Sequence, residues 1–200
     1  MDTDRLARVV DLIDAANAAD PNPVATPDGE RPAELVYGER MSAMLARFCP
    51  TASEHLTIAV RGQHIERWTS PRATYPDGRI GYLKWRKDLK DHHAGRVGAL
   101  MDEAGYAAPD IVRVASLIRK ERLKHDAEAQ TLEDVACLVF LTHHAEAFIA
   151  KHDDAKVVDI LAKTAAKMSN GGLEAASRLA LPERLGRLMG IALAGQAASS

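Results

Sequence analysis

The sequence of 200 residues has few cysteines, few aromatic side chains and no excess of charge of either sign. Its two cysteines, Cys49 and Cys137, have no partner at a metal-type spacing, so we expect reduced thiols in a cytoplasmic protein. The formal net charge is −2, with Lys and Arg interspersed among Asp and Glu. No strongly basic face is implied, so nucleic acid is not the expected partner.

Long apolar runs are also absent. No stretch approaches the roughly 20 apolar residues that span a bilayer, so we expect no membrane partner. The acidic start Met1-Asp2-Thr3-Asp4 is not followed by the apolar segment of a signal peptide. Apolar residues make up 46% and charged residues 27%, an ordinary composition for a globular domain that buries a core.

The common catalytic sequence motifs are missing as well. The chain has no Gly-x-Gly-x-x-Gly, no Walker loop, no Cys-x-x-Cys and no His-Glu-x-x-His. None of its serines lies in the surroundings of a nucleophile elbow, so acyl transfer has no specific support.

What the sequence does have is helical periodicity. Apolar spacing, prolines and capping residues predict helices over 4–19, 32–49, 51–68, 82–104, 109–123, 132–151, 153–168 and 173–195. Polar loops are expected at 20–31 and 69–81, and no strand-like alternation of useful length is present. The predicted fold is all-α, a single-domain bundle of about seven or eight helices over 1–200, with its core at 4–195 and a disordered tail at 196–200.

The third expected helix ends in the segment Arg61-Gly62-Gln63-His64-Ile65-Glu66-Arg67-Trp68. On a helix, Arg61, His64 and Trp68 would share one face, with Arg67 close to His64. A titratable nitrogen beside two permanent cations suits a metal, a phosphate or a carboxylate better than it suits a packed core. The loop that follows adds Arg72, either at the rim of a pocket or on a plain surface.

Two further polar pairs are candidates for a site. His92 and His93 are about 100° apart on a helix, so only one can face the core, and spacing leaves the choice open. Glu133 and Asp134 come just before a run, 135–141, that is apolar on every side. At least one of these carboxylates should point inward and need a partner. Structural pairing and direct participation in a site are about equally expected.

Several of these segments together resemble a known family. They are Tyr37-Gly38-Glu39-Arg40-Met41-Ser42, 61–68, Pro71-Arg72, Tyr75-Pro76, 81–86, His93-Ala94, 132–141, Lys163-Thr164 and Lys167-Met168-Ser169. The chain is similar over about residues 4–193 to the family catalogued as domain of unknown function 4202. That resemblance implies no particular activity.

A more distant similarity is to metal-dependent hydrolases of the HD class. Their helices place a histidine, a His-Asp pair and a later aspartate around one or two metals, and this chain offers His64, His93 and Asp134 in that order. It departs from the pattern at Ala94, which follows His93 where the class has aspartate. The similarity implies a divalent first-row metal (Mn, Fe or Zn) held by His64, His93 and Asp134, with Glu133 as base or extra ligand.

The resulting first hypothesis is a metal-dependent phosphohydrolase acting on a small phosphorylated metabolite or nucleotide. Arg61 and Arg67 would assist catalysis, and the anionic substrate would be bound by Arg61, Gln63, Arg67, Arg72 and Lys120. The alternatives are a metal-free module of the same fold that binds a small anion, and an RNA or protein interaction scaffold. The scaffold would use the basic and aromatic stretch 72–86. A homo-oligomer is left open.

Overall fold

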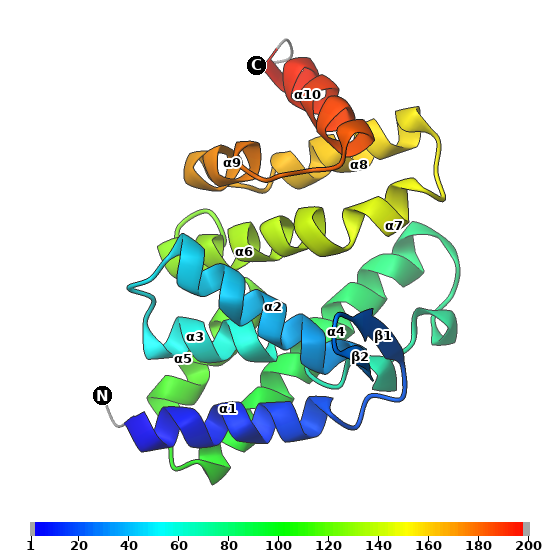
Figure 1. The fold of residues 1–200 in the computed structure, drawn as a ribbon. Coiled ribbons are helices and arrows are strands. Elements are labelled where there is room, and N and C mark those ends of the chain that lie inside the picture. Colours follow the sequence, from blue (N-terminus) through cyan, green and yellow to red (C-terminus); the bar gives the residue numbers. More distant parts are fainter. Residues whose placement is uncertain (1–2, 198–200) are drawn as a thin grey trace. The chain divides into compact units, whose positions relative to one another are not determined.

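The structure is a computed structural model that describes residues 3–197, and its backbone divides between Ala129 and Gln130 into two compact units. Each unit is described by itself (Figure 1). Apart from one short hairpin, the regular structure of the described residues is helical, which confirms the all-α class. None of the helices within 3–197 has the length and apolar character needed to cross a bilayer.

The N-terminal unit contains five longer helices, a hairpin and two 3-10 turns. These are α1 (Thr3–Asn17), β1 (Pro23–Thr26), β2 (Gly29–Pro32), α2 (Ala33–Phe48), α3 (Glu54–Gly62), η1 (Arg67–Thr69), η2 (Arg72–Thr74), α4 (Gly78–Glu103) and α5 (Ala108–Arg119). Helix α6 (Ala127–His143) begins in the last residues of the N-terminal unit and continues into the C-terminal unit. That unit adds α7 (Ala145–Ile149), α8 (Asp154–Ala165), α9 (Asn170–Ser177) and α10 (Glu183–Ala197).

Among the described residues, the helices differ from the predicted ones in number and in bounds. The expected loop 20–31 holds most of the antiparallel pair β1–β2, whose turn at residues 27 and 28 leads into Gly29 with a φ of 108°. The expected helices 132–151 and 173–195 are each divided, the second before Pro182, whose missing N–H cannot continue a helix. Of the tail expected at 196–200, residues 196 and 197 belong to α10 and the other three lie outside the described residues.

The largest error concerns the expected helix 51–68. Ser53 caps the helix, because its hydroxyl accepts the Leu56 N–H at 3.1 Å. The helix α3 then ends at Gly62, and residues 63–66 reverse the chain before η1. Glu66 has a φ of 51°, a left-handed conformation that no α-helix tolerates. The expectation that Arg61, His64 and Trp68 share one helix face is therefore wrong.

Close packing of α3 places this reversal. Helix α3 packs against α1, α2, α4 and α5, and α4 also packs against α5 and α1. A Cβ added to Gly62 would lie 2.4 Å from Val97 Cγ2 of α4, so only glycine lets α3 end this close to α4. The core around it consists of fully or nearly fully buried apolar side chains, including Ile13, Met41, Leu56, Ile58, Ile65, Met101, Leu117 and Ile118.

In the C-terminal unit, α10 packs against α8 and α7. Val157, Leu161, Leu185 and Leu188 form its apolar centre, each at most 1% exposed. A polar contact ties α6 to α9, because Asp134 Oδ1 accepts the Ser169 N–H at 2.8 Å. The described part of this unit is thus organised around buried helix faces, with Asp134 as a polar anchor.

Candidate functional site

The chain reversal after α3 is held from two sides. Asn17, the last residue of α1, is 2% exposed, and its Oδ1 accepts the Glu66 N–H at 3.0 Å. From α4, Arg96 Nε donates to both carboxylate oxygens of Glu66, at 3.0 and 3.1 Å. Ile65 between them is fully buried. The loop is therefore fixed in one conformation even though Glu66 is strained.

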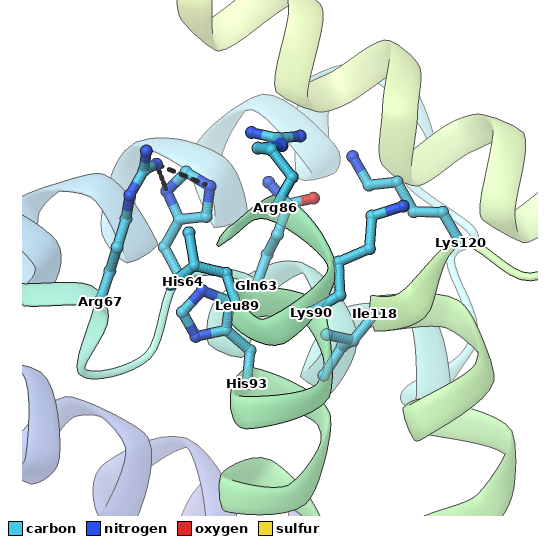
Figure 2. Close-up of a pocket in the computed structure, with 9 residues that line it drawn as sticks. All are labelled: Gln63, His64, Arg67, Arg86, Leu89, Lys90, His93, Ile118 and Lys120. Carbon is cyan, nitrogen blue, oxygen red and sulfur yellow. Dashed lines mark hydrogen bonds between the residues drawn. The ribbon is translucent and has the colours of Figure 1, made fainter. Parts of the chain in front are cut away.

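This reversal forms one wall of a pocket (Figure 2). The pocket is a small hollow with a cavity volume of about 30 Å³ that is partly open to solvent, so it can enclose only part of a ligand. Three segments supply its lining: the end of α3 with the reversal, one face of α4, and the end of α5. The lining residues are Gln63, His64, Arg67, Arg86, Leu89, Lys90, His93, Ile118 and Lys120.

His93 is the most buried titratable group of the pocket, with 3% of its surface exposed. Its Nδ1 lies 2.8 Å from the carbonyl oxygen of Ile65. Because a carbonyl only accepts, Nδ1 carries the proton, and in the neutral ring Nε2 is left as an acceptor. Nε2 is buried and has no hydrogen-bond partner among the described residues.

His64 lies beside His93, with 5.9 Å between the ring centroids. The Tyr37 ring stacks on it at 4.2 Å with an interplanar angle of 11°. Arg67 Nη1 lies 3.3 Å from both ring nitrogens, as the dashed lines in Figure 2 show. Glu34 approaches from α2, with its Oε2 3.7 Å from His64 Nδ1. His64 is thus held between an aromatic ring, a guanidinium and a carboxyl group.

Burial and the surrounding cations keep both imidazoles neutral. Desolvation lowers the pKa of His64 well below its usual value, and the charges of Arg67, Lys120 and Arg86 lower it further. Desolvation lowers the pKa of His93 to about 3, against the opposing effect of its bond to the Ile65 carbonyl. Neither ring adds positive charge to the pocket at neutral pH.

Glu34 is perturbed in the opposite direction. Desolvation raises its pKa to about 7, and the nearby Arg67 offsets only part of that effect. Its Oε2 is buried without a hydrogen-bond partner among the described residues. A carboxyl group that titrates near neutral pH therefore lies next to His64, just outside the pocket lining.

Four permanent cations line the pocket: Arg67, Arg86, Lys90 and Lys120. Lys120 follows the last turn of α5 with a φ of 58°, an unfavourable conformation that ends the helix and turns the chain there. The nine lining residues include no carboxylate. Such a set of side chains attracts an anion.

The structure brings together five of the residues predicted for a site: Gln63, His64, Arg67, His93 and Lys120. It also decides between the adjacent histidines, since His93 lines the pocket and the less buried His92 does not.

Arg61 and Arg72 lie elsewhere. Arg61 is bound to Asp14 by two hydrogen bonds of 2.6 and 2.5 Å, and Arg72 donates to the carbonyl oxygens of Tyr75 and Pro76, both at 2.9 Å.

Glu133 and Asp134 belong to the C-terminal unit, and both are buried, as expected for residues before such an apolar run. Asp134 accepts hydrogen bonds from the backbone and hydroxyl of Ser169, at 2.8 and 2.5 Å, and from Gln130 at 3.1 Å. A Cβ on Gly172 would come within 2.6 Å of its Oδ1. Asp134 therefore has a complete structural role at the start of α9.

A metal fits these residues less well than an anion does. Among the described residues, no three His, Cys, Asp or Glu side chains come together so as to hold a metal ion. The pocket offers two imidazoles surrounded by cations, whereas first-row metals favour mixed imidazole and carboxylate ligands. A metal held by His64, His93 and Asp134 stays a prediction.

Sequence reasoning missed Glu34, Tyr37, Arg86 and Lys90 as members of the site. Arg86 and Lys90 could have been found, because with His93 they occupy positions i, i+4 and i+7 of one face of α4. Glu34 and Tyr37 reach His64 only through the packing of α2 against α3, which no local pattern shows.

The sequence pattern of the family described as "Domain of unknown function (DUF4202)" matches residues 7–189. The chain belongs to this family. No curated protein and no solved structure shows significant similarity to this chain. Five of the nine lining residues lie within segments that the resemblance had singled out: Gln63, His64, Arg67, Arg86 and His93.

Proposed function

We propose that the N-terminal unit binds a small phosphorylated metabolite or nucleotide in this pocket. The observation that carries the proposal is the convergence of Arg67, Arg86, Lys90 and Lys120 on one cavity whose lining contains no carboxylate. Phosphate oxygens accept charge-assisted hydrogen bonds from arginine and lysine, and these bonds strengthen where water is partly excluded.

The neutral state of the histidines supports the same ligand. Desolvation lowers the pKa of His64 most, and the charges of Arg67, Lys120 and Arg86 lower it further, so the site disfavours one more positive charge. A bound anion would relieve that repulsion. Stacking on Tyr37 and contact with Arg67 hold the His64 ring in place before any ligand arrives.

Thermal unfolding with and without ligand tests the proposal. Inorganic phosphate, AMP and ribose 5-phosphate should raise the melting temperature, and sodium chloride at equal ionic strength should not. Arg67→Ala should remove most of the shift. Arg119→Ala is the matched control, since Arg119 precedes Lys120, pairs with Asp91 at 2.9 Å and does not line the pocket. Equal shifts in both variants would contradict the proposal.

Metal-dependent hydrolysis of the same ligand, resembling the HD class, is the second candidate. It is favoured by the buried Nε2 of His93, which has no hydrogen-bond partner in the part of the chain that the structure describes and whose Nδ1–H is fixed by a carbonyl, as in many metal-bound histidines. A metal there would polarise the phosphoryl group and activate water. Elemental analysis of untagged protein after incubation with manganese, iron or zinc tests it. Bound metal that is lost in His64→Ala and His93→Ala is expected, and retention in both would exclude these ligands.

The scaffold alternative gains less support. Trp85 is 9% exposed and its Nε1 donates to the Ser70 carbonyl at 2.9 Å, so its ring is not free to stack on a base. Tyr75 is likewise tied to Asp88 at 3.0 Å.

A further inference from the structure

Two buried acceptors lie among the cations of the pocket. His93 Nε2 and Gln63 Oε1 belong to residues that are 3% and 5% exposed, and neither atom has a hydrogen-bond partner among the described residues. A buried acceptor without a partner costs free energy, so native structures keep such atoms where a ligand or water completes them. Both residues line the same cavity and are labelled in Figure 2.

The orientation of each acceptor is fixed by a bond made at its other end. His93 donates from Nδ1 to the Ile65 carbonyl, which leaves Nε2 as the acceptor. Gln63 donates from Nε2 to the Tyr37 hydroxyl at 2.9 Å, which turns its Oε1 away from that partner. The two atoms are therefore held in place as acceptors before a ligand binds.

A fully ionised phosphate cannot satisfy these atoms, because it has only acceptor oxygens. The ligand group that reaches them must donate. An ammonium group would donate, but Arg67, Arg86, Lys90 and Lys120 repel a further cation. A neutral hydroxyl group donates a hydrogen bond without adding charge.

We infer that the ligand of this pocket is a phosphorylated polyol or sugar, whose phosphate binds the cations and whose hydroxyl groups donate to His93 Nε2 and Gln63 Oε1. The inference rests on the proposed function, since it extends the same phosphate site. It separates the ligand from simple alkyl phosphates, whose dianion offers the cations its charge but has no hydroxyl group that could donate to either acceptor.

Matched pairs of phosphate esters test this inference by isothermal titration. Glycerol 3-phosphate is compared with propyl phosphate, glycerol 2-phosphate with isopropyl phosphate, and ribose 5-phosphate with pentyl phosphate. In at least one pair the hydroxylated ester should bind more tightly, by roughly tenfold for each acceptor that finds a donor. Gln63→Met keeps the side-chain length but removes the acceptor, so it should reduce the ratio of the two affinities within the pair that shows the preference.

Two further results make the outcome decisive. His93→Phe should also reduce the preference, and its circular dichroism shows whether the variant is folded; Gln63→Met carries the test if it is not. Alkyl phosphates that bind as tightly as their hydroxylated partners in all three pairs would overturn the inference and leave the phosphate site standing. Failure of every ester and of inorganic phosphate to bind would overturn the proposed function, and the inference with it.

Discussion

The hydrogen bond from His93 Nδ1 to the Ile65 carbonyl, 2.8 Å long, joins α4 to the chain reversal after α3. It fixes the position of the loop and the tautomer of the ring. His64 lies in that reversal and Arg67 directly follows it, and both side chains line the pocket. The same bond leaves Nε2 of His93 available to a ligand.

We predict that His93 stays neutral, with its proton on Nδ1, down to a pH of about 4. Its pKa is lowered to about 3 by burial, so the folded chain binds fewer protons at this ring than the unfolded chain between pH 3 and 6.5. Stability is therefore lost as the pH falls through this window, by about 1.4 kcal/mol per pH unit for such a group. Histidine side-chain NMR of the folded protein measures the tautomer and the pKa.

The urea-unfolded chain is the control for this titration. There the same ring should titrate near its ordinary value of about 6.5. A folded His93 that gains a proton near pH 6 would contradict both the tautomer and the role of Nε2 as an acceptor.

Local patterns predicted most helices of this fold, because apolar periodicity and capping residues are local. Ser53 is an example, since its capping bond needs only its own helix. The end of α3 was not predictable in this way. Nothing in 61–68 forbids a helix; it ends because Asn17 and Arg96, far away in sequence, bind Glu66 in a left-handed conformation.

The candidate site likewise has some features that local sequence predicts and others that depend on contacts between distant segments. Charged and imidazole side chains near residue 64 indicated where it lies, and His64, Arg67 and Lys120 were named correctly as neighbours of one pocket. Arg61 was expected there on helical spacing, but Asp14 of α1 binds it. At least one of Glu133 and Asp134 was expected to point inward and need a partner, and Asp134 finds its partners in Ser169 and Gln130. Which partner a buried polar group finds is decided by tertiary contacts that spacing does not contain.

Glu34→Gln should change how stability depends on pH. In the folded chain the pKa of Glu34 is raised to about 7 from 4.5, so between these values the folded state holds more protons than the unfolded state. This contribution to stability is present at pH 4.5 and lost as the pH rises to 7. A glutamine at this position does not ionise, so the Glu34→Gln protein should not lose stability in this way. Relative to the wild type, its free energy of unfolding should increase as the pH rises, by up to about 3 kcal/mol at pH 7.

Urea unfolding of both proteins between pH 4.5 and 8 measures this difference. Glu39→Gln is the control, because Glu39 is an exposed partner of Arg31 on the same helix as Glu34. Wild-type and Glu34→Gln curves that stay parallel over the whole range would show that Glu34 ionises normally.

Asn17→Ala should destabilise the protein by about 1–3 kcal/mol. The change removes the acceptor of the Glu66 N–H, which leaves a strained residue without the bond that holds it there. Asn22→Ala is the control, since the exposed Asn22 bonds only with neighbouring Asp20 and the Ala33 N–H among the described residues. Equal losses of stability in the two variants would mean that Asn17 does not fix the reversal.

Gly62→Ala should destabilise the protein by about 1–3 kcal/mol, although alanine favours a helix more than glycine does. The added Cβ would lie 2.4 Å from Val97 Cγ2, so α3 and α4 must move apart, and the pocket walls at His64 and His93 move with them. Gly95→Ala is the matched control, because it lies inside α4 with nothing within 4 Å of the new Cβ. That variant should be stabilised by about 0.5–1 kcal/mol. Urea unfolding that gives both variants the same sign of change would contradict the close approach of α3 to α4 on which the pocket depends.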